Sequence, residues 1–244
     1  MSGGVFADRV VVVTGGGSGI GRAAAVAFAV QGARCVVVTG RRVEPLKETA
    51  GLHSAIVPVV ADVRSVAGAD AVAAVVPGVV DVLVHNAGIL RPTPVGSFEL
   101  DDVREVLETN VVGPLILTRR LLPLMSRSGA NIVFVSSVVG QRRAAPGTSV
   151  LAAGKAAQDN LTRSWAVELA PRGIRVNAVA PGGVKSAAMK LTPSPEQLRR
   201  MSLVGRRGEP EEVATWITRL AEPSSGFVTG QILPIDGGMG LAAL

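Results

Sequence analysis

Short runs of valine, isoleucine and other apolar residues alternate with longer segments rich in alanine and leucine along the whole chain. Each short run has the length of a buried strand, and each longer segment has a helical pattern. The pattern predicts strands over residues 10–13, 35–39, 55–60, 81–85, 131–136, 175–180 and 231–235. It predicts helices over residues 19–31, 44–51, 66–76, 101–125, 151–170, 195–202 and 209–221.

Strands that alternate with helices form right-handed βαβ units, which build a parallel sheet with helices on both faces. No linker rich in Pro, Gly or Ser divides the chain, and 244 residues suffice for one substantial core. We therefore predict the α/β class, as a single Rossmann-type domain over residues 1–244 with a doubly wound parallel sheet of about seven strands. The run Thr192-Pro193-Ser194-Pro195 predicts a small loop insertion near residues 184–207, on the substrate side.

A glycine cluster follows the first predicted strand. Residues 9–22 read RVVVVTGGGSGIGR, and a helix is expected directly behind them. A strand that turns sharply into a helix collects backbone N–H groups and the positive end of a helix dipole at one point, which suits a pyrophosphate. Because strand, glycines and helix occur together within one βαβ unit, they predict dinucleotide binding rather than a tight turn alone.

Other chemistry-bearing residues follow the remaining strands. In a doubly wound sheet, ligands bind beyond the carboxyl ends of the strands. The residues at these ends are Gly40-Arg41, Asp62, Asn86-Ala87-Gly88, Ser136-Ser137 and Pro181-Gly182. Together with the glycine cluster, six segments are therefore expected to meet at one edge of the sheet.

The end of the second strand indicates which dinucleotide binds. An NAD site usually has an acidic residue there, whereas this chain has Gly40, Arg41 and Arg42. A guanidinium grips a 2′-phosphate with paired hydrogen bonds, so we predict NADP(H), with Arg41 as the main contact. For Arg42, a solvent-facing position is the alternative. Asp62 can accept from the adenine amino group, cap the next helix, or do both.

Composition argues against several other classes of protein. The formal net charge is +6, but the arginines are scattered and aromatic residues are scarce, so we expect no nucleic-acid partner. One cysteine and two histidines are too few for a metal site, and Cys35 is expected to be a buried, inert thiol. No apolar run is long enough to cross a bilayer, and no leader opens the chain, so we expect a cytoplasmic protein without a membrane partner.

Taken together, the motifs resemble those of the short-chain dehydrogenase/reductase family over essentially the whole chain. The residues that carry the resemblance are Thr14, Gly15, Gly19 and Gly21 of a TGxxxGxG motif, Asn86-Ala87-Gly88, Asn110, Ser137, Lys155, the run 175–182, the run 226–231 and Asp236-Gly237-Gly238. His85 stands where the family often has a further Asn.

The resemblance implies hydride transfer between NADP(H) and a carbonyl or alcohol of a small-molecule substrate. It implies catalytic roles for Ser137, which holds the substrate oxygen, for Lys155, which binds the nicotinamide ribose, and for Asn110, which holds a water in a proton relay. The predicted cofactor-binding residues are Gly15, Gly17, Ser18, Gly19, Ile20, Gly21, Arg41, Arg42, Asp62, Val63, Asn86, Ala87, Gly88, Lys155, Pro181, Gly182 and Val184. The family also pairs the helices that correspond to residues 101–125 and 151–170, so we expect a homodimer or homotetramer.

One family residue is missing. The family has its proton-donating Tyr four residues before the Lys, where this chain has Leu151, and the chain contains no tyrosine. A positioned acid–base contributes roughly 10²–10⁴ in rate. Three functions therefore stay open. The first is reduction of a C=N, C=C or C=O bond with another proton donor, the candidates being Ser137, Thr148, Ser149, Lys155 or a water held by Asn110 and Lys155. The second is a redox-neutral reaction, such as a cyclisation or isomerisation, with NADP(H) bound structurally. The third is cofactor binding without catalysis.

Two features bear on the substrate. Arg142 and Arg143 lie between Ser137 and Leu151, in a loop that would border the substrate, and they favour an anionic one. A solvated loop is the alternative. Lys185 and Ser186 follow Pro181-Gly182 in the loop expected to cover the nicotinamide.

Overall fold

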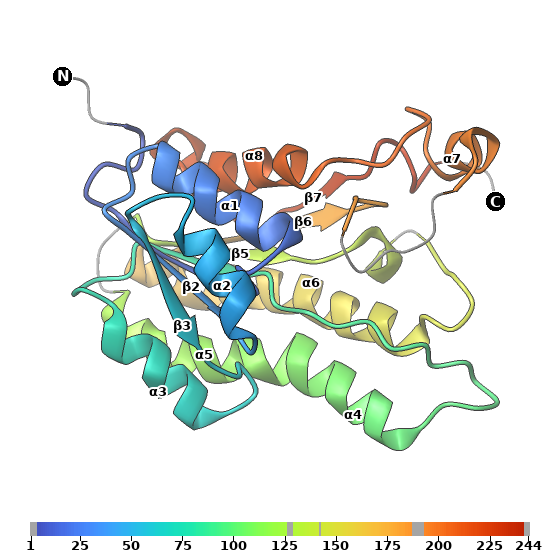
Figure 1. Cartoon of the computed structure of the whole chain (residues 1–244), viewed down its shortest axis with the longest axis horizontal. Helices are drawn as coiled ribbons and strands as arrows, with labels where there is room; N and C mark the ends of the chain where they lie inside the picture. The colour runs from blue at the N-terminus through green and yellow to red at the C-terminus, as the bar shows by residue number, and fades with distance from the viewer. Residues whose placement is uncertain (1–3, 126–128, 142, 187–192, 242–244) are drawn as a thin grey trace.

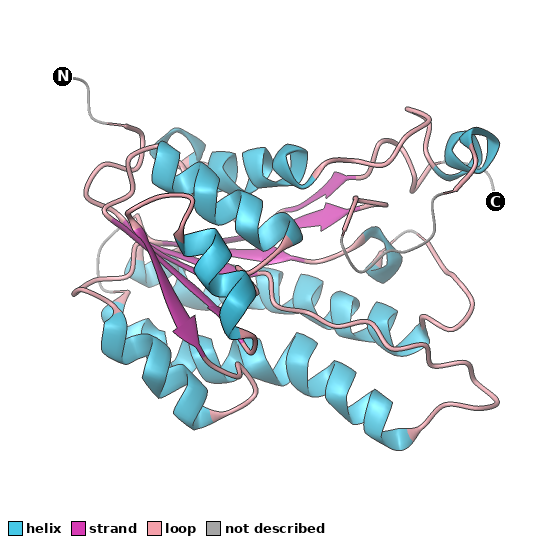
Figure 2. Cartoon of the chain, in the orientation of Figure 1, coloured by secondary structure: helices cyan, strands magenta, loops and turns pink. Residues whose placement is uncertain are grey.

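A parallel sheet of seven strands runs through the centre of the molecule (Figure 1, Figure 2). The computed structural model describes residues 4–125, 129–141, 143–186 and 193–241. The strand order is β3-β2-β1-β4-β5-β6-β7, which confirms the predicted doubly wound sheet. The strands are β1 (Val10–Thr14), β2 (Cys35–Gly40), β3 (Ile56–Val60), β4 (Val82–His85), β5 (Asn131–Val135), β6 (Arg175–Pro181) and β7 (Ile232–Ile235).

The central strands are valine-rich because both of their faces are covered. Every residue of β1 and β5 is buried. Val11 and Val13 of β1 point into one hydrophobic cluster, and Val10 and Val12 point into the cluster on the opposite face. This alternation follows from the pleat of a strand, in which successive side chains leave opposite faces.

Helices cover each face of the sheet as a layer (Figure 1). On one face lie α1 (Gly19–Val30), α2 (Val43–Ala50) and α8 (Pro210–Ala221). On the other lie α3 (Val66–Val75), α5 (Gly113–Leu121) and α6 (Ser149–Leu169), with α4 (Leu100–Leu107) leading into α5. The short helix α7 (Pro195–Met201) belongs to the predicted insertion, of which residues 187–192 lie outside the described residues.

The helix predicted over residues 101–125 is not continuous. A π-helical turn, Glu108–Val112, separates α4 from α5, and a 3₁₀ turn, Leu122–Leu124, follows α5. Pro114 has no backbone N–H, so it cannot donate to the carbonyl of Asn110, four residues earlier. The regular helical ladder is therefore interrupted at this point, which the apolar pattern alone did not reveal.

An aromatic cluster fills the core beneath β4 and β5. The ring of His85 stacks on Phe134 at 4.9 Å, and Trp165 of α6 packs against both rings. His85 Nε2 lies 2.7 Å from Thr118 Oγ1, and burial lowers the pKa of His85 to about 3. His85 is thus a neutral, hydrogen-bonded core residue. The predicted buried free thiol of Cys35 is also confirmed.

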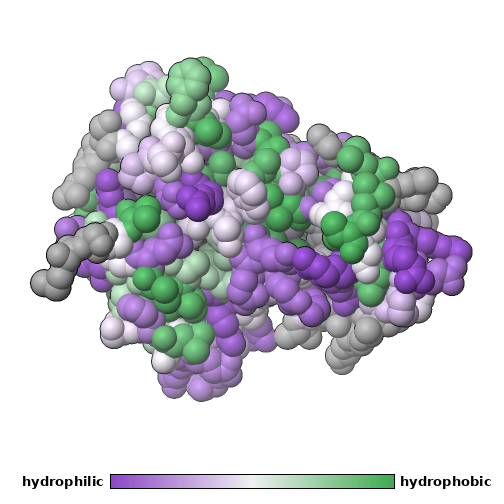
Figure 3. All heavy atoms as spheres, turned by 90° about the horizontal axis from the view of Figure 1, so that it is seen from above, coloured by the Kyte–Doolittle hydropathy of each residue, from purple (hydrophilic) through white to green (hydrophobic). Residues whose placement is uncertain are grey.

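The surface carries hydrophobic and hydrophilic groups in alternation. On the face above α1 and α8, hydrophobic groups form separate patches with hydrophilic side chains between them (Figure 3). None of the helices in the described part of the chain combines the length and the apolar character that crossing a bilayer requires.

Candidate cofactor and active site

A cavity of about 610 Å³ opens beyond the carboxyl ends of the strands. Its wall contains residues that follow each of β1 to β6, as expected for a doubly wound sheet. Of the predicted site residues, those in the wall are Gly15, Gly17, Ser18, Gly19, Ile20, Arg41, Arg42, Asp62, Val63, Asn86, Ala87, Gly88, Ser137, Lys155, Pro181, Gly182 and Val184. Gly21 and Asn110 are not in the wall, and both support it from behind.

The turn between β1 and α1 is shaped for close approach of a ligand. Gly15 and Gly19 have φ values of +66° and +53°, which favour glycine. No atom of the protein lies within 4 Å of the position that a Cβ of residue 19 would occupy. Because residue 19 is glycine, this space stays open to a ligand. Ser18 precedes α1 in an extended conformation, and its hydroxyl makes no capping bond to the described residues. Open space, free N–H groups of a first helical turn and an unengaged hydroxyl fit a dinucleotide pyrophosphate.

Gly21 acts through packing. A methyl group added there would lie 2.3 Å from the Gly15 carbonyl oxygen and 2.4 Å from Asn86 Nδ2. Its missing side chain therefore lets α1 approach the glycine turn and the end of β4.

Arg22 was not among the predicted site residues, although it follows the glycine motif directly. Its guanidinium donates to the carbonyl of Gly17 at 2.7 Å, to Thr49 Oγ1 at 3.0 Å and to Glu48 at 2.7 Å. The side chain thereby ties the glycine turn to α2.

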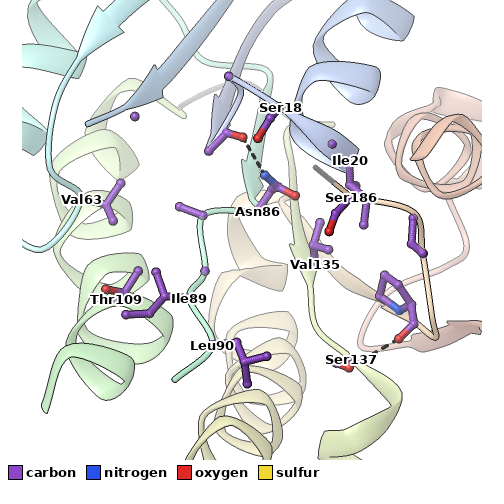
Figure 4. Close-up of a pocket in the computed structure, with 18 of the residues that line it drawn as sticks. Ser18, Ile20, Val63, Asn86, Ile89, Leu90, Thr109, Val135, Ser137 and Ser186 are labelled. Atoms are coloured by element: carbon purple, nitrogen blue, oxygen red, sulfur yellow. Dashed lines mark hydrogen bonds between the residues drawn. The ribbon is translucent and has the colours of Figure 1, made fainter. Parts of the chain in front are cut away.

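Thr14 and Asn86 join the ends of β1 and β4. Thr14 Oγ1 donates to the Val84 carbonyl and accepts from the N–H groups of Asn86 and Ala87. Asn86 Nδ2 donates to the carbonyls of Thr14, at 2.8 Å, and Gly15, at 3.1 Å. These bonds fix the floor of the cavity between the two strands, and the bond from Asn86 to the Gly15 carbonyl is drawn as a dashed line in Figure 4.

Cationic side chains lie where the second strand ends. Arg41 and Arg42 line the cavity, and Arg41 Nη1 lies 3.3 Å from Glu105 Oε1 of α4. Asp62 also lines the cavity, but both of its carboxylate oxygens accept from the Arg64 side chain, which holds the pKa of Asp62 below its usual range. The cap of α3 is Ser65, whose hydroxyl accepts from the Gly68 N–H, so Asp62 is not that cap.

One wall of the cavity is mostly apolar. Val63, Ile89 and Thr109 lie together on the side opposite Ile20 and Ser186 (Figure 4). The Thr109 hydroxyl is buried and has no hydrogen-bond partner among the described residues. A buried hydroxyl without a partner is costly, and Thr109 Oγ1 has no surface open to the cavity, so a bound ligand would reach it only if the side chain turned. The sequence analysis did not select Thr109, because a lone Thr on a helix carries no pattern of its own.

Lys155 of α6 projects into the same cavity. Its ammonium donates to the carbonyl of Val135, at 2.7 Å, and to Gln158 Oε1, at 3.1 Å. Burial lowers the pKa of Lys155 to about 8, against the opposing effect of the Asp159 carboxylate. Leu151, one helical turn earlier, also lines the cavity and brings no ionisable group.

Few of the hydroxyl groups proposed as proton donors reach this cavity. Ser137 lines it and makes only long hydrogen bonds, at 3.5 Å to the Pro181 carbonyl and 3.4 Å from the Val139 N–H. Thr148 and Ser149 are not in the wall, and their hydroxyls donate to the carbonyls of Ala145 and Thr93. Ser137 and Lys155 are therefore the two candidate side chains with access to the cavity.

Asn110 lies in the π-helical turn and is fully buried. Its Oδ1 accepts from the Ile89 N–H at 3.0 Å, and its Nδ2 donates to the Ile89 carbonyl at 3.1 Å. The side chain therefore holds the loop that follows Gly88. The side chain is engaged with Ile89, and the main-chain carbonyl of Asn110 accepts from Gln158 Nε2, so the role of Asn110 in a proton relay stays a prediction.

The arginines proposed to meet an anionic substrate are not both described. Arg142 lies outside the described residues. Arg143 donates to the carbonyls of Met239, at 3.1 Å, and Met201, at 3.5 Å, and so connects the loop after β5 to the C-terminal segment and α7. Lys185 lines the cavity and pairs with Glu209, at the start of α8. The Arg143 side chain therefore binds main-chain carbonyls of the protein and does not face the cavity.

Known structures share this architecture closely. A Caenorhabditis elegans protein, described as a short-chain dehydrogenase/reductase of unknown function with cofactor, superposes with a TM-score of 0.89 and 34% identity, over 98% of this chain and 97% of that one. A family model described as enoyl-(acyl carrier protein) reductase matches residues 15–240.

The chain belongs to the short-chain dehydrogenase/reductase family. Among curated members of this family, a 3-oxoacyl-(acyl-carrier-protein) reductase of Thermotoga maritima is 38% identical over 95% of this chain and 97% of its own length. A cis-4-hydroxycyclohexanecarboxylate dehydrogenase of Sinomonas cyclohexanicum is 41% identical over 96% and 97%. These short-chain dehydrogenases and reductases are oxidoreductases, and they cover this chain almost from end to end.

Proposed function

We propose that this protein is an NADP(H)-dependent oxidoreductase that reduces a C=N, C=C or C=O bond of a small molecule with a proton donor other than tyrosine. The observation that carries this proposal is the joint presence of Leu151, Lys155 and Ser137 in the wall of the cofactor cavity. When bound, NADP(H) supplies the hydride. The protein must then bind the cofactor, bind the substrate beside the nicotinamide and supply one proton.

Arg41 and Arg42 support the choice of NADP(H). Both line the cavity directly after β2, at the position where an acidic residue would favour NAD. The carboxylate that follows β3, Asp62, is already neutralised by Arg64. A 2′-phosphate would therefore meet guanidinium groups rather than a free carboxylate.

Lys155 is our choice for the proton donor. Leu151 stands at the position of the family's tyrosine, so no phenol can act between Lys155 and the substrate. Without that phenol the Lys155 ammonium faces the cavity itself, and its pKa of about 8 is close to neutrality. A general acid is most effective when its pKa lies near the working pH. Ser137 remains suited to hold the substrate atom that receives the proton.

The names of the curated relatives bear on the substrate. One acts on a 3-oxoacyl group attached to acyl carrier protein, and another on a hydroxylated ring that carries a carboxylate. Both names describe a carbonyl or an alcohol within a mainly apolar skeleton. Leu90, Ile89 and Leu151 give this cavity apolar walls of a matching kind.

A panel assay tests the proposal. The protein is mixed with NADPH and with imines, enones, quinones and ketones, and loss of absorbance at the reduced-nicotinamide band is followed. We expect at least one class to be reduced, with imines favoured because an iminium brings its own positive charge. Tight NADPH binding without reduction of any member would instead favour a redox-neutral reaction or a non-catalytic role.

We also propose that the protein forms a homodimer or homotetramer through α4, α5 and α6. Leu107, Val112 and Leu115 are each more than a third exposed on this side of the molecule. Single-chain mass in light scattering would contradict this proposal.

A further inference from the structure

A buried amide connects Lys155 to the π-helical turn. Gln158 is fully buried on α6, three residues after Lys155. Its Oε1 accepts from Lys155 Nζ at 3.1 Å, and its Nε2 donates to the carbonyl of Asn110 at 2.7 Å. Gln158 takes no part in the wall of the cavity, and the motifs of the sequence do not select it.

The irregular helix explains why the Asn110 carbonyl receives this amide. In a regular α-helix that carbonyl would accept from the N–H of residue 114, which here is Pro114 and has none. Gln158 Nε2 satisfies the carbonyl instead. Because a carbonyl can only accept, this bond also sets the orientation of the amide and turns Oε1 toward Lys155.

Two acceptors thereby fix two of the three N–H groups of the Lys155 ammonium. One is the Val135 carbonyl and the other is Gln158 Oε1. The three N–H bonds of an ammonium point in different directions, and Lys155 lines the cavity. The third N–H is therefore the one directed into the cavity. It is also the N–H that the ammonium loses when the amine becomes neutral.

The charges around Lys155 leave this position free to titrate. Val135, Gly88 and Gly140 meet the lysine from neighbouring segments and carry no charge. Asp159 is the neighbouring carboxylate, on the same helix; it accepts from Gln141 and lies beside Arg163. Gln158 therefore provides an acceptor without adding a negative charge, whereas a carboxylate at its place would hold the lysine permanently charged.

We propose that Gln158 is a positioning residue that holds Lys155 with its remaining N–H directed into the cavity, for delivery of one proton to the substrate. This inference rests on the proposed function. In the step, the N–H bond of the ammonium breaks and a bond forms between that hydrogen and the substrate atom that becomes basic as hydride adds next to it. Lys155 is left as a neutral amine and regains its proton from water.

Two substitutions of opposite effect test the proposal. Gln158→Glu puts a carboxylate against the ammonium and raises the pKa of Lys155, although the carboxylate gives up the bond that the amide donates to the Asn110 carbonyl. Gln158→Met removes an acceptor of the ammonium and lowers the pKa of Lys155. Lys155 titration is followed through the pH dependence of its modification by a small amine-reactive reagent, read by peptide mass spectrometry without cofactor. We expect the midpoints to move apart by at least one pH unit, which is a tenfold difference in reactivity at a fixed pH between them. The exposed Gln231→Leu serves as the matched control and should leave the midpoint unchanged.

The pH profile of substrate reduction separates this inference from the proposed function. Profiles that shift up for Gln158→Glu and down for Gln158→Met support the positioning role. Equal midpoints in all three proteins overturn it, even if NADPH reduction of a substrate is observed. Shifted labelling midpoints without reduction of any substrate leave the positioning intact and contradict the proposed function. If Gln158→Met fails to fold, the nearly isosteric Gln158→Glu alone decides, since only an upward shift agrees.

Discussion

Arg41 Nη1 lies 3.3 Å from Glu105 Oε1, and this contact joins the loop after β2 to α4. Glu105 also accepts from Arg91 and lies 3.7 Å from Arg64, so one carboxylate serves three guanidinium groups. The Arg41 side chain is half exposed, and an exposed ion pair of this kind contributes little to stability. Arg41 can therefore turn from Glu105 to a phosphate at small cost.

The first prediction concerns cofactor choice. Arg41→Ala should weaken NADPH binding about 10- to 100-fold, because a charge-assisted hydrogen bond contributes about 1.5–3 kcal/mol. Binding of NADH, which lacks the 2′-phosphate, should change little. Calorimetry with both nucleotides measures the effect, and the control is Arg34→Ala, at the amino end of β2, away from the cavity. Equal losses for both nucleotides would remove Arg41 from the phosphate site.

The second prediction concerns the missing phenol. Leu151→Tyr places a phenol one helical turn before Lys155, where both residues line the cavity. Reduction of simple ketones should rise by about 10²-fold or more, within the range that a positioned acid supplies. Leu151→Phe has the same ring without the hydroxyl and controls for shape. If the two variants reduce ketones at similar rates, the phenol of Leu151→Tyr does not act as the proton donor.

The third prediction concerns the unpartnered hydroxyl of Thr109. Thr109→Val keeps the shape and removes a hydroxyl that has no partner within the described chain. The free energy of unfolding without ligand should stay equal or rise slightly, whereas cofactor affinity should fall about 5- to 10-fold, as for one lost hydrogen bond. Thr109→Ser is the control and should retain affinity. Unchanged binding in Thr109→Val would mean that the cofactor does not use this group.

The fourth prediction concerns acid stability. His85 has a pKa of about 3 in the folded protein and about 6.5 when unfolded. Below pH 6.5 the unfolded chain therefore binds one more proton at His85 than the folded chain does. The contribution of His85 to the free energy of unfolding is fully present above pH 6.5 and is lost as the pH falls toward 3. Between pH 7 and pH 5 this loss amounts to about 2 kcal/mol. Urea denaturation should show that loss in the wild type but not in His85→Asn, and parallel losses in both would contradict it.

The fold could be predicted because its determinants are local. The run VVVV at residues 10–13 indicates a strand that is buried on both faces. The glycines between β1 and α1 indicate a turn with positive φ values, which other residues rarely adopt. The predicted cofactor residues come together for the same reason, since parallel strands end at one edge.

Other features depend on individual side-chain partners, which the pattern of apolar residues does not encode. The break at residues 108–112 follows from Pro114, which an apolar pattern does not take into account, and the amide that satisfies the freed Asn110 carbonyl belongs to Gln158, 48 residues after Asn110. Arg143 meets Met239, 96 residues later, so its role in a substrate loop could not be judged from its neighbours. Asp62 was correctly expected at the cavity, but its partner Arg64 was not foreseen, because either residue alone also suits a solvated turn.

The core cluster in which His85 is held neutral also contains a tryptophan whose fluorescence reports on folding. With no tyrosine in the sequence, emission excited beyond the absorption of phenylalanine comes from Trp165 and Trp216. Trp165 is packed against Phe134 and His85, whereas Trp216 is 45% exposed on α8. Replacing Trp216 by Phe would leave a single indole, and its colour and intensity would report directly on whether the interior beneath β4 and β5 is intact.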